Sequence, residues 1–478
     1  MQEPTQSADA DSISAAWTRV ALDYLGSWLD FQVRQARQPG CAVAVAQDGE
    51  LLWEAAFGRA DLGTGEALTP RHRFRVASLS KTLTAVGLMR LAEAGRLRLD
   101  DSAGAFVDGL HPAVARVTLT QLLSHSAGLS RDGADASYFA DLRPFPSRDE
   151  VLEELRRPPV IEPGLRLKYS NYGYALLGLV IEAVTGEAYC DWTAREVIAA
   201  CGLSETTPDA PSDPSRLARG HTGALPAGRL TIPGQNSTEA FACVTGLTAT
   251  AADMARFYGR LAPAAAGALL SEASRRDMIQ PRGHDDDSAL GRAYGLGVHV
   301  GETAGWSYFG HVGRFQGVVT RVLTLPETGL SLAVIANAID GPAVSWIEGA
   351  VRILRRFHDE GAPAGYARDW TSRWWSLWGP LDVVALGDKV LAYNPAEPTP
   401  FAEAIEITLQ GPDSGVVSRA PVMDRYGEPV ARRVGQGGRP SLLRIGSAAF
   451  GDEAAAAQRI RAQYGRPSAA QLQGEAGQ

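Results

Sequence analysis

Two β-hairpin patterns, one near each end of residues 1–358, constrain the possible folds of this chain most strongly. One hairpin turns at Asp48-Gly49, a dipeptide that favours a tight turn, and the other turns at residues 326–329. Helical patterns over residues 12–37 and 344–354 lie outside the hairpins, and a helical region separates them. The strand-like segments are residues 41–46, 51–57, 318–325 and 330–337. The sequence therefore predicts an antiparallel sheet packed on terminal helices, with an all-α subdomain beside it.

The composition of the chain changes after Phe357. Residues 359–366 are polar and rich in Gly and Pro, which is typical of a linker. Beyond them, roughly seven or eight short strand-like segments follow at regular spacing, which predicts a small antiparallel barrel or sandwich. The predicted parts are one domain over residues 1–358, the linker over 359–366, a β-barrel domain over 367–464 and a disordered tail over 465–478.

A group of four tryptophans follows the predicted linker. Two interpretations stay open for it. The indole rings pack inside the barrel or between the two domains, or they form a wall on one side of a substrate cleft. The four are Trp370, Trp374, Trp375 and Trp378.

Composition and charge exclude several classes of protein. The net charge of -8, without a Lys/Arg cluster, argues against a nucleic-acid or anionic-membrane surface. No apolar run approaches the roughly 18 residues that a membrane helix needs. His284-Asp285-Asp286-Asp287 has no partner motif and is interpreted as a solvated loop, and no nucleotide-binding loop is present. We therefore expect no metal and no cofactor, and a small molecule or a peptide as the partner; the oligomeric state stays open.

The four cysteines and the N-terminus bear on the compartment. The cysteines show no C-x-x-C and no framework spacing, so we expect reduced, mostly buried thiols. Met1-Gln2-Glu3-Pro4 shows neither a basic segment nor an apolar one, so a secretory signal is absent from the sequence as given. The expected location is cytoplasmic, or periplasmic if the sequence has been trimmed. The cysteines are Cys41, Cys190, Cys201 and Cys243.

Three short motifs carry the chemistry. Ser78 and Lys81 are three residues apart, so in a helix they share one face and an ammonium lies beside a hydroxyl. A serine hydroxyl attacks carbonyl groups poorly unless a neighbouring group takes its proton. Tyr169-Ser170-Asn171 and His311-Val312-Gly313 follow in that order. The combination predicts a nucleophilic serine.

Together the motifs resemble the catalytic set of penicillin-binding proteins and serine β-lactamases. The resemblance is to the branch with class C β-lactamases, D-Ala-D-Ala carboxypeptidases, D-aminopeptidases and related esterases, and it covers residues 15–358. Residues 122–129 and Pro163-Gly164 also stand where this family has similar segments. The resemblance implies the β-lactamase/transpeptidase-like α/β (α+β) fold. More distantly, the C-terminal segment resembles the lipocalin-like module of some peptidases and cyclases.

The resemblance also implies roles for individual residues. Ser78 is the nucleophile, and either Tyr169 or neutral Lys81 is the general base. The charge on Lys81 is expected to lower the pKa of Tyr169. Asn171 is expected to hold Lys81 and to contact the substrate amide. The backbone N–H groups of Ser78 and Arg314 are expected to form the oxyanion hole.

The third motif departs from the Lys-Thr-Gly of many relatives, which binds a free carboxylate next to the scissile bond. A histidine of ordinary pKa, about 6.5, is mostly neutral at pH 7, and Val312 brings no hydroxyl. We therefore expect His311 and Gly313 to close the site without binding a carboxylate strongly. Arg314 either binds one bidentately or points to solvent. Cys243 is expected to line the pocket, and His125 to pack a turn.

The predicted function is that of a serine hydrolase that forms an acyl-enzyme on Ser78 and cleaves peptide or amide bonds, including those of D-residue-containing or unusual peptides. The alternatives are a carboxylesterase and an acyl-transferring, macrocyclising thioesterase of the penicillin-binding-protein type. β-Lactamase and D-Ala-D-Ala carboxypeptidase activities are disfavoured by His311. A binding protein on the same fold is disfavoured by the intact set of Ser78, Lys81, Tyr169 and Asn171.

Overall fold

The computed structural model describes residues 8–287, 291–421, 425–435 and 440–465. It divides into two compact units, a larger one of residues 33–347 and a smaller one of residues 1–32 together with 348–478. Most of the predicted disordered tail, residues 466–478, lies outside the described residues. The predicted domain boundary at residue 358 stays a prediction.

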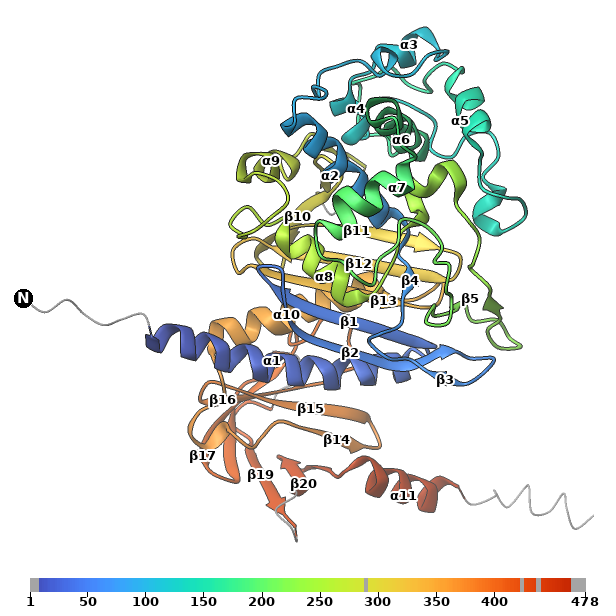
Figure 1. The fold of residues 1–478 in the computed structure, drawn as a ribbon. Helices are drawn as coiled ribbons and strands as arrows, with labels where there is room; N and C mark the ends of the chain where they lie inside the picture. The colour runs from blue at the N-terminus through green and yellow to red at the C-terminus, as the bar shows by residue number, and fades with distance from the viewer. Residues whose placement is uncertain (1–7, 288–290, 422–424, 436–439, 466–478) are drawn as a thin grey trace, which may run out of the picture. The chain divides into compact units, whose positions relative to one another are not determined.

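The larger unit is built on a nine-stranded antiparallel sheet (Figure 1). Both predicted hairpins are confirmed. β1 (Gly40–Gln47) turns into β2 (Glu50–Asp61), and β12 (Val318–Leu325) turns into β13 (Leu330–Ala336). β1 pairs directly with β13, so the two hairpins form the centre of one sheet. The remaining strands are β3 (Glu66–Ala67), β8 (Gly283–His284), β9 (Ala293–Tyr294), β10 (His299–Thr303) and β11 (Trp306–Phe315).

Helices of the larger unit form the predicted α subdomain above the sheet (Figure 1). At its centre α2 (Ser80–Glu93) packs against α6 (Asn171–Thr185) and against a π-helical turn, Ala242–Gly246. Nearly every residue of α2 is buried, as expected of a helix surrounded by protein. The other helices are α3 (Pro112–Ala115), α4 (Leu119–Leu123), α5 (Arg148–Leu155), α7 (Tyr189–Thr193) and α9 (Glu272–Met278), while α8 (Ala251–Arg260) packs on the sheet against β1 and β13. Short pairs β4 (Phe74–Arg75) with β7 (Thr248–Ala249) and β5 (Gly220–His221) with β6 (Thr231–Ile232) complete the unit.

The smaller unit contains an eight-stranded antiparallel barrel in which each strand pairs with the next in sequence. A bridge between Trp375 and Gly451 joins its two ends. Trp370 and Trp374 lie in its hydrophobic core, so these two rings have the packing role, whereas the Trp378 side chain is 91% exposed. The barrel domain is confirmed; its likeness to lipocalins stays a prediction. The strands are β14 (Ser372–Ser376), β15 (Gly379–Leu386), β16 (Lys389–Tyr393), β17 (Ile405–Gly411), β18 (Ser414–Arg419), β19 (Pro429–Val434), β20 (Pro440–Ile445) and β21 (Ala448–Phe450).

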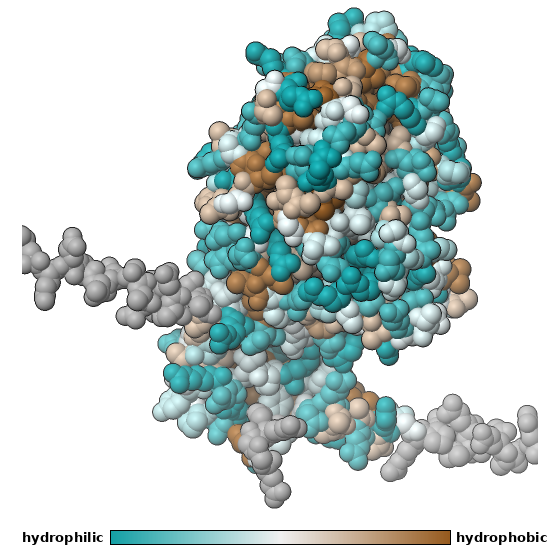
Figure 2. Space-filling model, in the orientation of Figure 1, coloured by the Kyte–Doolittle hydropathy of each residue, from teal (hydrophilic) through white to brown (hydrophobic). Residues whose placement is uncertain are grey.

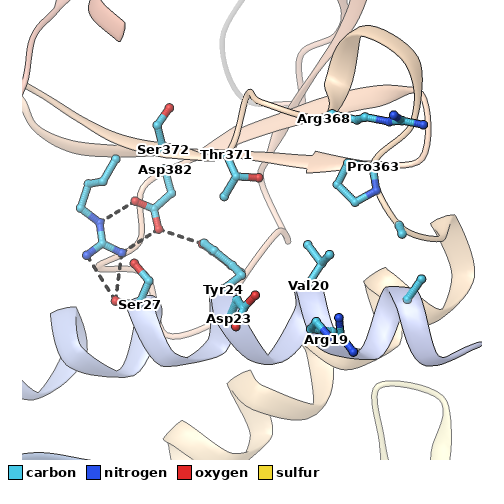
Figure 3. A pocket seen from close by; sticks show the side chains of 13 residues that line it. Arg19, Val20, Asp23, Tyr24, Ser27, Pro363, Arg368, Thr371, Ser372 and Asp382 are labelled. Carbon is cyan, nitrogen blue, oxygen red and sulfur yellow. Dashed lines mark hydrogen bonds and ion pairs between the residues drawn. The ribbon is translucent and has the colours of Figure 1, made fainter. Parts of the chain in front are cut away.

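A buried polar network holds the N-terminal helix α1 (Ala8–Gln35) to this barrel (Figure 3). The Asp382 carboxylate is 1% exposed and accepts hydrogen bonds from the Tyr24 hydroxyl at 2.8 Å and from the Arg373 guanidinium at 2.6 and 2.8 Å. Arg373 also donates to the backbone carbonyl of Ser27 on α1, at 3.4 Å. A cavity of about 610 Å³ opens next to this network. Helices α10 (Ala343–Glu360) and α11 (Glu453–Tyr464) precede and follow the barrel.

None of the described helices is both long and apolar enough to cross a membrane. On the face of the larger unit seen in Figure 2, hydrophobic residues form separate patches among hydrophilic ones. All four cysteines are free thiols; Cys190 is half-buried and the other three are buried.

Candidate active site

The candidate nucleophile, Ser78, lies in a sharp 3₁₀ turn, Ala77–Leu79, immediately before α2. Ala77 has φ of 57°, in the left-handed region, which costs about 1–2 kcal/mol for a residue with a side chain. The surrounding contacts hold this conformation. The Ser80 hydroxyl donates to the Ala77 carbonyl at 2.7 Å and accepts from the backbone N–H of Leu247 at 2.9 Å. The turn is therefore fixed from two directions, and Ser78 stands at its apex.

Lys81 lies one helical turn beyond the nucleophile and has no exposed surface. Its ammonium group donates to the Ser78 hydroxyl at 3.1 Å and to the Val244 carbonyl at 3.0 Å. Burial lowers the pKa of Lys81 to about 7, although Cys243 and Asp132 partly oppose the shift. Close to neutral pH, a large fraction of Lys81 is therefore uncharged and able to accept the Ser78 proton.

Tyr169 contacts the same hydroxyl, because its phenol group is hydrogen-bonded to Ser78. Burial raises the pKa of Tyr169 well above its ordinary value, while the bond to Ser78 and the charge of Arg131 lower it only in part. The sequence-based expectation of a lowered pKa is therefore wrong. Loss of solvation outweighs the attraction of a neighbouring cation, and Lys81 is itself only partly charged. Tyr169 remains a neutral phenol.

Asn171 begins helix α6, with Ser170 as the capping residue before it. The Asn171 amide nitrogen donates to the Asp132 carboxylate at 2.5 Å, and the other carboxylate oxygen pairs with Arg131 at 3.1 Å. The Asn171 amide oxygen is buried without a hydrogen-bond partner among the described residues. The ammonium of Lys81 donates to Ser78 and to the Val244 carbonyl, and not to this amide oxygen, so the expected contact between Asn171 and Lys81 is not observed.

The edge of β11 forms the opposite wall of the site. β10 pairs with β11 only as far as Gly310, so the β11 edge from residue 311 to 315 is not covered by β10. A Cβ atom on Gly313 would lie 2.3 Å from the Val76 carbonyl oxygen, so only glycine lets β11 pass this close to the nucleophile turn. Arg314 follows it on the strand, exposed, and lines the cavity.

His311 is fully buried and is not one of the residues that line the cavity. Its Nδ1 is 2.7 Å from the Val312 carbonyl oxygen and its Nε2 is 2.9 Å from the Tyr294 hydroxyl. A carbonyl only accepts, so the ring proton is on Nδ1 and Nε2 accepts from Tyr294. Burial, with the charge of Lys81, lowers the pKa of His311 to about 3. The ring is neutral at pH 7, as expected. The cause is burial, whereas the expectation from the sequence was a histidine of ordinary pKa.

These elements enclose a cavity of about 480 Å³. Of the predicted site residues, Ser78, Tyr169, Asn171 and Arg314 line it. Cys243 does not. Its thiol donates to the Ala240 carbonyl at 3.4 Å and lines a different cavity, so the predicted position of this side chain is not the observed one. Seven further lining residues belong to no motif that the sequence shows: Arg131, Asp132, Phe139, His299, Phe315, Gln316 and Ile339.

His125 packs a turn, as predicted, and in doing so positions the Tyr169 segment. Its Nδ1 accepts from the backbone N–H of Ser170 at 3.1 Å, and its ring lies 4.1 Å from that of Tyr169. Within the described residues, no group of three or more metal-ligating side chains is present.

Comparisons with known proteins identify the family of this chain. Residues 26–350 match the family described as Beta-lactamase. Penicillin-binding protein 4 of Amycolatopsis lactamdurans is 30% identical over 337 residues, which is 66% of this chain and 84% of that protein. Esterase EstB of Burkholderia gladioli is 32% identical over 194 residues, covering 37% of this chain and 48% of that protein.

Solved structures show the same fold. The octameric penicillin-binding protein homologue from Pyrococcus abyssi aligns with 90% of this chain and 99% of its own, at a TM-score of 0.64 and 21% identity. The D-amino acid amidase from Ochrobactrum anthropi SV3 aligns with 71% of this chain and 99% of its own, at 0.60 and 22%. This chain therefore belongs to the β-lactamase family and is a serine hydrolase of the branch similar to class C β-lactamases and penicillin-binding proteins.

Proposed function

We propose that this protein acylates Ser78 and hydrolyses amide bonds, with neutral Lys81 as the general base. The observation that carries the proposal is the 3.1 Å contact between the Lys81 nitrogen and the Ser78 hydroxyl, together with a Lys81 pKa of about 7. A base works best when its pKa is near the working pH. Tyr169 keeps its own proton and hydrogen-bonds to the same hydroxyl, so it is suited to relay protons.

In the acylation step, Lys81 takes the Ser78 proton as the Ser78 oxygen bonds to the substrate carbonyl carbon. The carbonyl oxygen gains negative charge, which the backbone N–H groups of Ser78 and Arg314 stabilise in this proposal; one such donor is worth about 2.7–4 kcal/mol. The carbon–nitrogen bond then breaks, and the amine leaves with the proton, passed through Tyr169. A water molecule then attacks the acyl-enzyme ester, a proton returns to the Ser78 oxygen through the same groups, and the acid is released.

Asp132 supports a substrate that carries a free ammonium group near the scissile bond. Its carboxylate borders the cavity, with its side chain 23% exposed, and Asn171 and Arg131 each occupy one acceptor position on it. A carboxylate has about four such positions, so both oxygens can accept another bond. Phe139 and Phe315 supply apolar surface. Amides of apolar amino acids fit these features, and the similar D-amino acid amidase is described with phenylalanine and its amide.

Ester cleavage is the second candidate, favoured by the similarity to Esterase EstB. The same acyl-enzyme on Ser78 serves both reactions. A comparison of amide and ester substrates with one common acyl group distinguishes them, and an added amine that appears in the product would indicate acyl transfer.

The first test is the intact mass after reaction with a fluorophosphonate, for the wild type and for Ser78→Ala. We expect one adduct that the variant lacks; near-wild-type turnover by Ser78→Ala would refute the proposal.

The second test is Asp132→Asn. It should raise KM for amino acid amides about tenfold or more, because a charged hydrogen bond is lost, and leave N-acetylated amides unchanged. Asp135→Asn, an exposed carboxylate paired with Arg143, is the matched control.

A further inference from the structure

A short segment at the catalytic cavity, residues 130–132, is tied to the start of α6 by three hydrogen bonds. The Ser170 hydroxyl donates to the Ser130 carbonyl at 2.6 Å, and the backbone N–H of Asn171 donates to the Arg131 carbonyl at 2.8 Å. The Asn171 amide nitrogen donates to the Asp132 carboxylate at 2.5 Å. Each residue of the segment therefore has one bond to Ser170 or Asn171, which fixes the segment beside the second catalytic motif.

The middle residue of this segment, Arg131, lies over the ring of Tyr169. Its guanidinium carbon is 5.7 Å from the ring centre, and its Nε is paired with the Asp132 carboxylate at 3.1 Å. The side chain is 68% exposed and lines the catalytic cavity. A neutral ring attracts such a cation only weakly, whereas a ring that gains negative charge attracts it as a full ion.

Arg131 is the permanent positive charge over this ring. The other cation is Lys81, whose nitrogen is 5.0 Å from the ring centre, but Lys81 is largely neutral above pH 7. A guanidinium stays charged at every working pH. The charge of Arg131 lowers the pKa of Tyr169 by more than Asp132 raises it. Burial lowers the pKa of one neighbouring group and raises those of three others, so all four are neutral: His125, and Tyr174, Tyr258 and Tyr294.

Tyr169 carries negative charge only while the reaction proceeds. In the proposed function it passes a proton to the leaving nitrogen and receives one from Lys81, so one proton moves in total from the Ser78 oxygen to the amine. As the phenol proton begins to leave, negative charge builds on the phenol oxygen and the ring. A positive charge that is already in place stabilises this state more than it stabilises the resting phenol, and therefore lowers the barrier.

We propose that Arg131 is a positioning residue of the proton relay: held over the Tyr169 ring by the 130–132 segment, its guanidinium stabilises the charge that the phenol gains when an amine leaves. This inference rests on the proposed function, because it requires acylation of Ser78 and proton relay by Tyr169. Arg131 gives up no proton itself, since a guanidinium does not deprotonate in proteins.

The effect of Arg131 should depend on the leaving group. An amine must gain a proton before it leaves, whereas 4-nitrophenolate leaves as an anion and needs none from Tyr169. The test therefore compares two substrates with the same acyl group, phenylalanine amide and phenylalanine 4-nitrophenyl ester, each in D and L forms. The quantity measured is kcat/KM, and the ratio of the amide value to the ester value cancels any change in binding of the shared acyl group.

Arg131→Gln should lower kcat/KM for the amide about 3–10-fold and leave the ester within about twofold. This is the low end of what a unit charge at 5.7 Å can do, because the Arg131 side chain is largely exposed and screened by solvent. Arg131→Lys should recover part of the loss, because it keeps the charge without the planar group. Both variants should react with a fluorophosphonate at the wild-type rate, because fluoride also leaves as an anion, and this reaction shows that they are folded.

Arg143→Gln is the matched control. The Arg143 guanidinium carbon lies 5.9 Å from the ring centre of Tyr138, and Arg143 pairs with Asp135 at 3.4 Å, so the same arrangement is repeated among residues that do not line the catalytic cavity. Cleavage of both substrates by this variant should be unchanged.

Three results would overturn the proposal. They are an Arg131→Gln protein that loses equal activity toward amide and ester, one whose amide kcat/KM stays within twofold of the wild type, and an Arg131→Lys protein as slow as the Gln variant. Equal losses would mean that Arg131 shapes the site or binds the shared acyl group. Failure of the proposed function looks different, because the wild type would then form the fluorophosphonate adduct but cleave neither substrate.

Discussion

Replacing Lys81 with Met should stabilise the protein at low pH and gain nothing at high pH. Lys81 is fully buried, and its pKa falls from 10.5 to about 7. At about 1.4 kcal/mol for each tenfold change, burying the charged form costs about 5 kcal/mol. Between pH 7 and 10.5 the unfolded chain binds a proton that the folded chain does not, so the stability of the wild type rises with pH in this window. Below pH 7 the full cost is present, and above 10.5 it is absent.

The assay is urea unfolding of the wild type and Lys81→Met at several pH values from 6 to 9.5. The difference in unfolding free energy should shrink by about 1.4 kcal/mol per pH unit above pH 7. The hydrogen bonds lost with the ammonium shift this difference by a constant, so the slope is diagnostic. Ser78→Ala is the control, because it is inactive and keeps the buried lysine, and it should follow the wild type.

A difference that does not vary with pH would refute the reasoning, since Lys81 would then titrate alike in both states.

The same pKa should appear in catalysis. The kcat/KM of the wild type should rise with pH to a plateau, with its midpoint near 7, because only neutral Lys81 accepts the Ser78 proton. A midpoint near 10 would be equally damaging to the proposed mechanism.

Three other substitutions test separate parts of the structure. Tyr169→Phe should lower kcat about 10²–10⁴-fold through loss of proton relay, with binding little changed; steady-state kinetics checks this, and an unchanged kcat contradicts the relay. Gly313→Ala should reduce the rate of fluorophosphonate labelling about 100-fold or more, because its Cβ would lie 2.3 Å from the Val76 carbonyl oxygen and must push β11 away. Arg373→Met should destabilise the smaller unit by about 3–5 kcal/mol in urea unfolding, because the buried Asp382 carboxylate loses its counter-charge and keeps the hydrogen bond from Tyr24; a change below 1 kcal/mol would argue that this network is not structural.

The sheet and the motifs could be predicted because their signals are local. Asp48-Gly49 favours a tight turn by itself, and the two segments beside it are largely apolar. Ser78 and Lys81 are neighbours through helix spacing alone. The barrel of the smaller unit was predictable for the same reason, since each of its strands pairs with the next in sequence.

By contrast, the chemistry of the site depends on segments far apart in the chain. Asp132 and His299 join the cavity only because the fold brings their segments to Ser78, and no motif indicates either. The pKa of Tyr169 rises because packing removes water from the phenol, which outweighs the neighbouring charge that the sequence suggests. The Cys243 side chain lines a different cavity, while the carbonyl of its neighbour Val244 accepts a hydrogen bond from Lys81. Local residue patterns therefore indicate which elements form and which groups can react. The protonation of these groups and the residues beside them follow from the complete fold, because desolvation depends on everything that packs around a group.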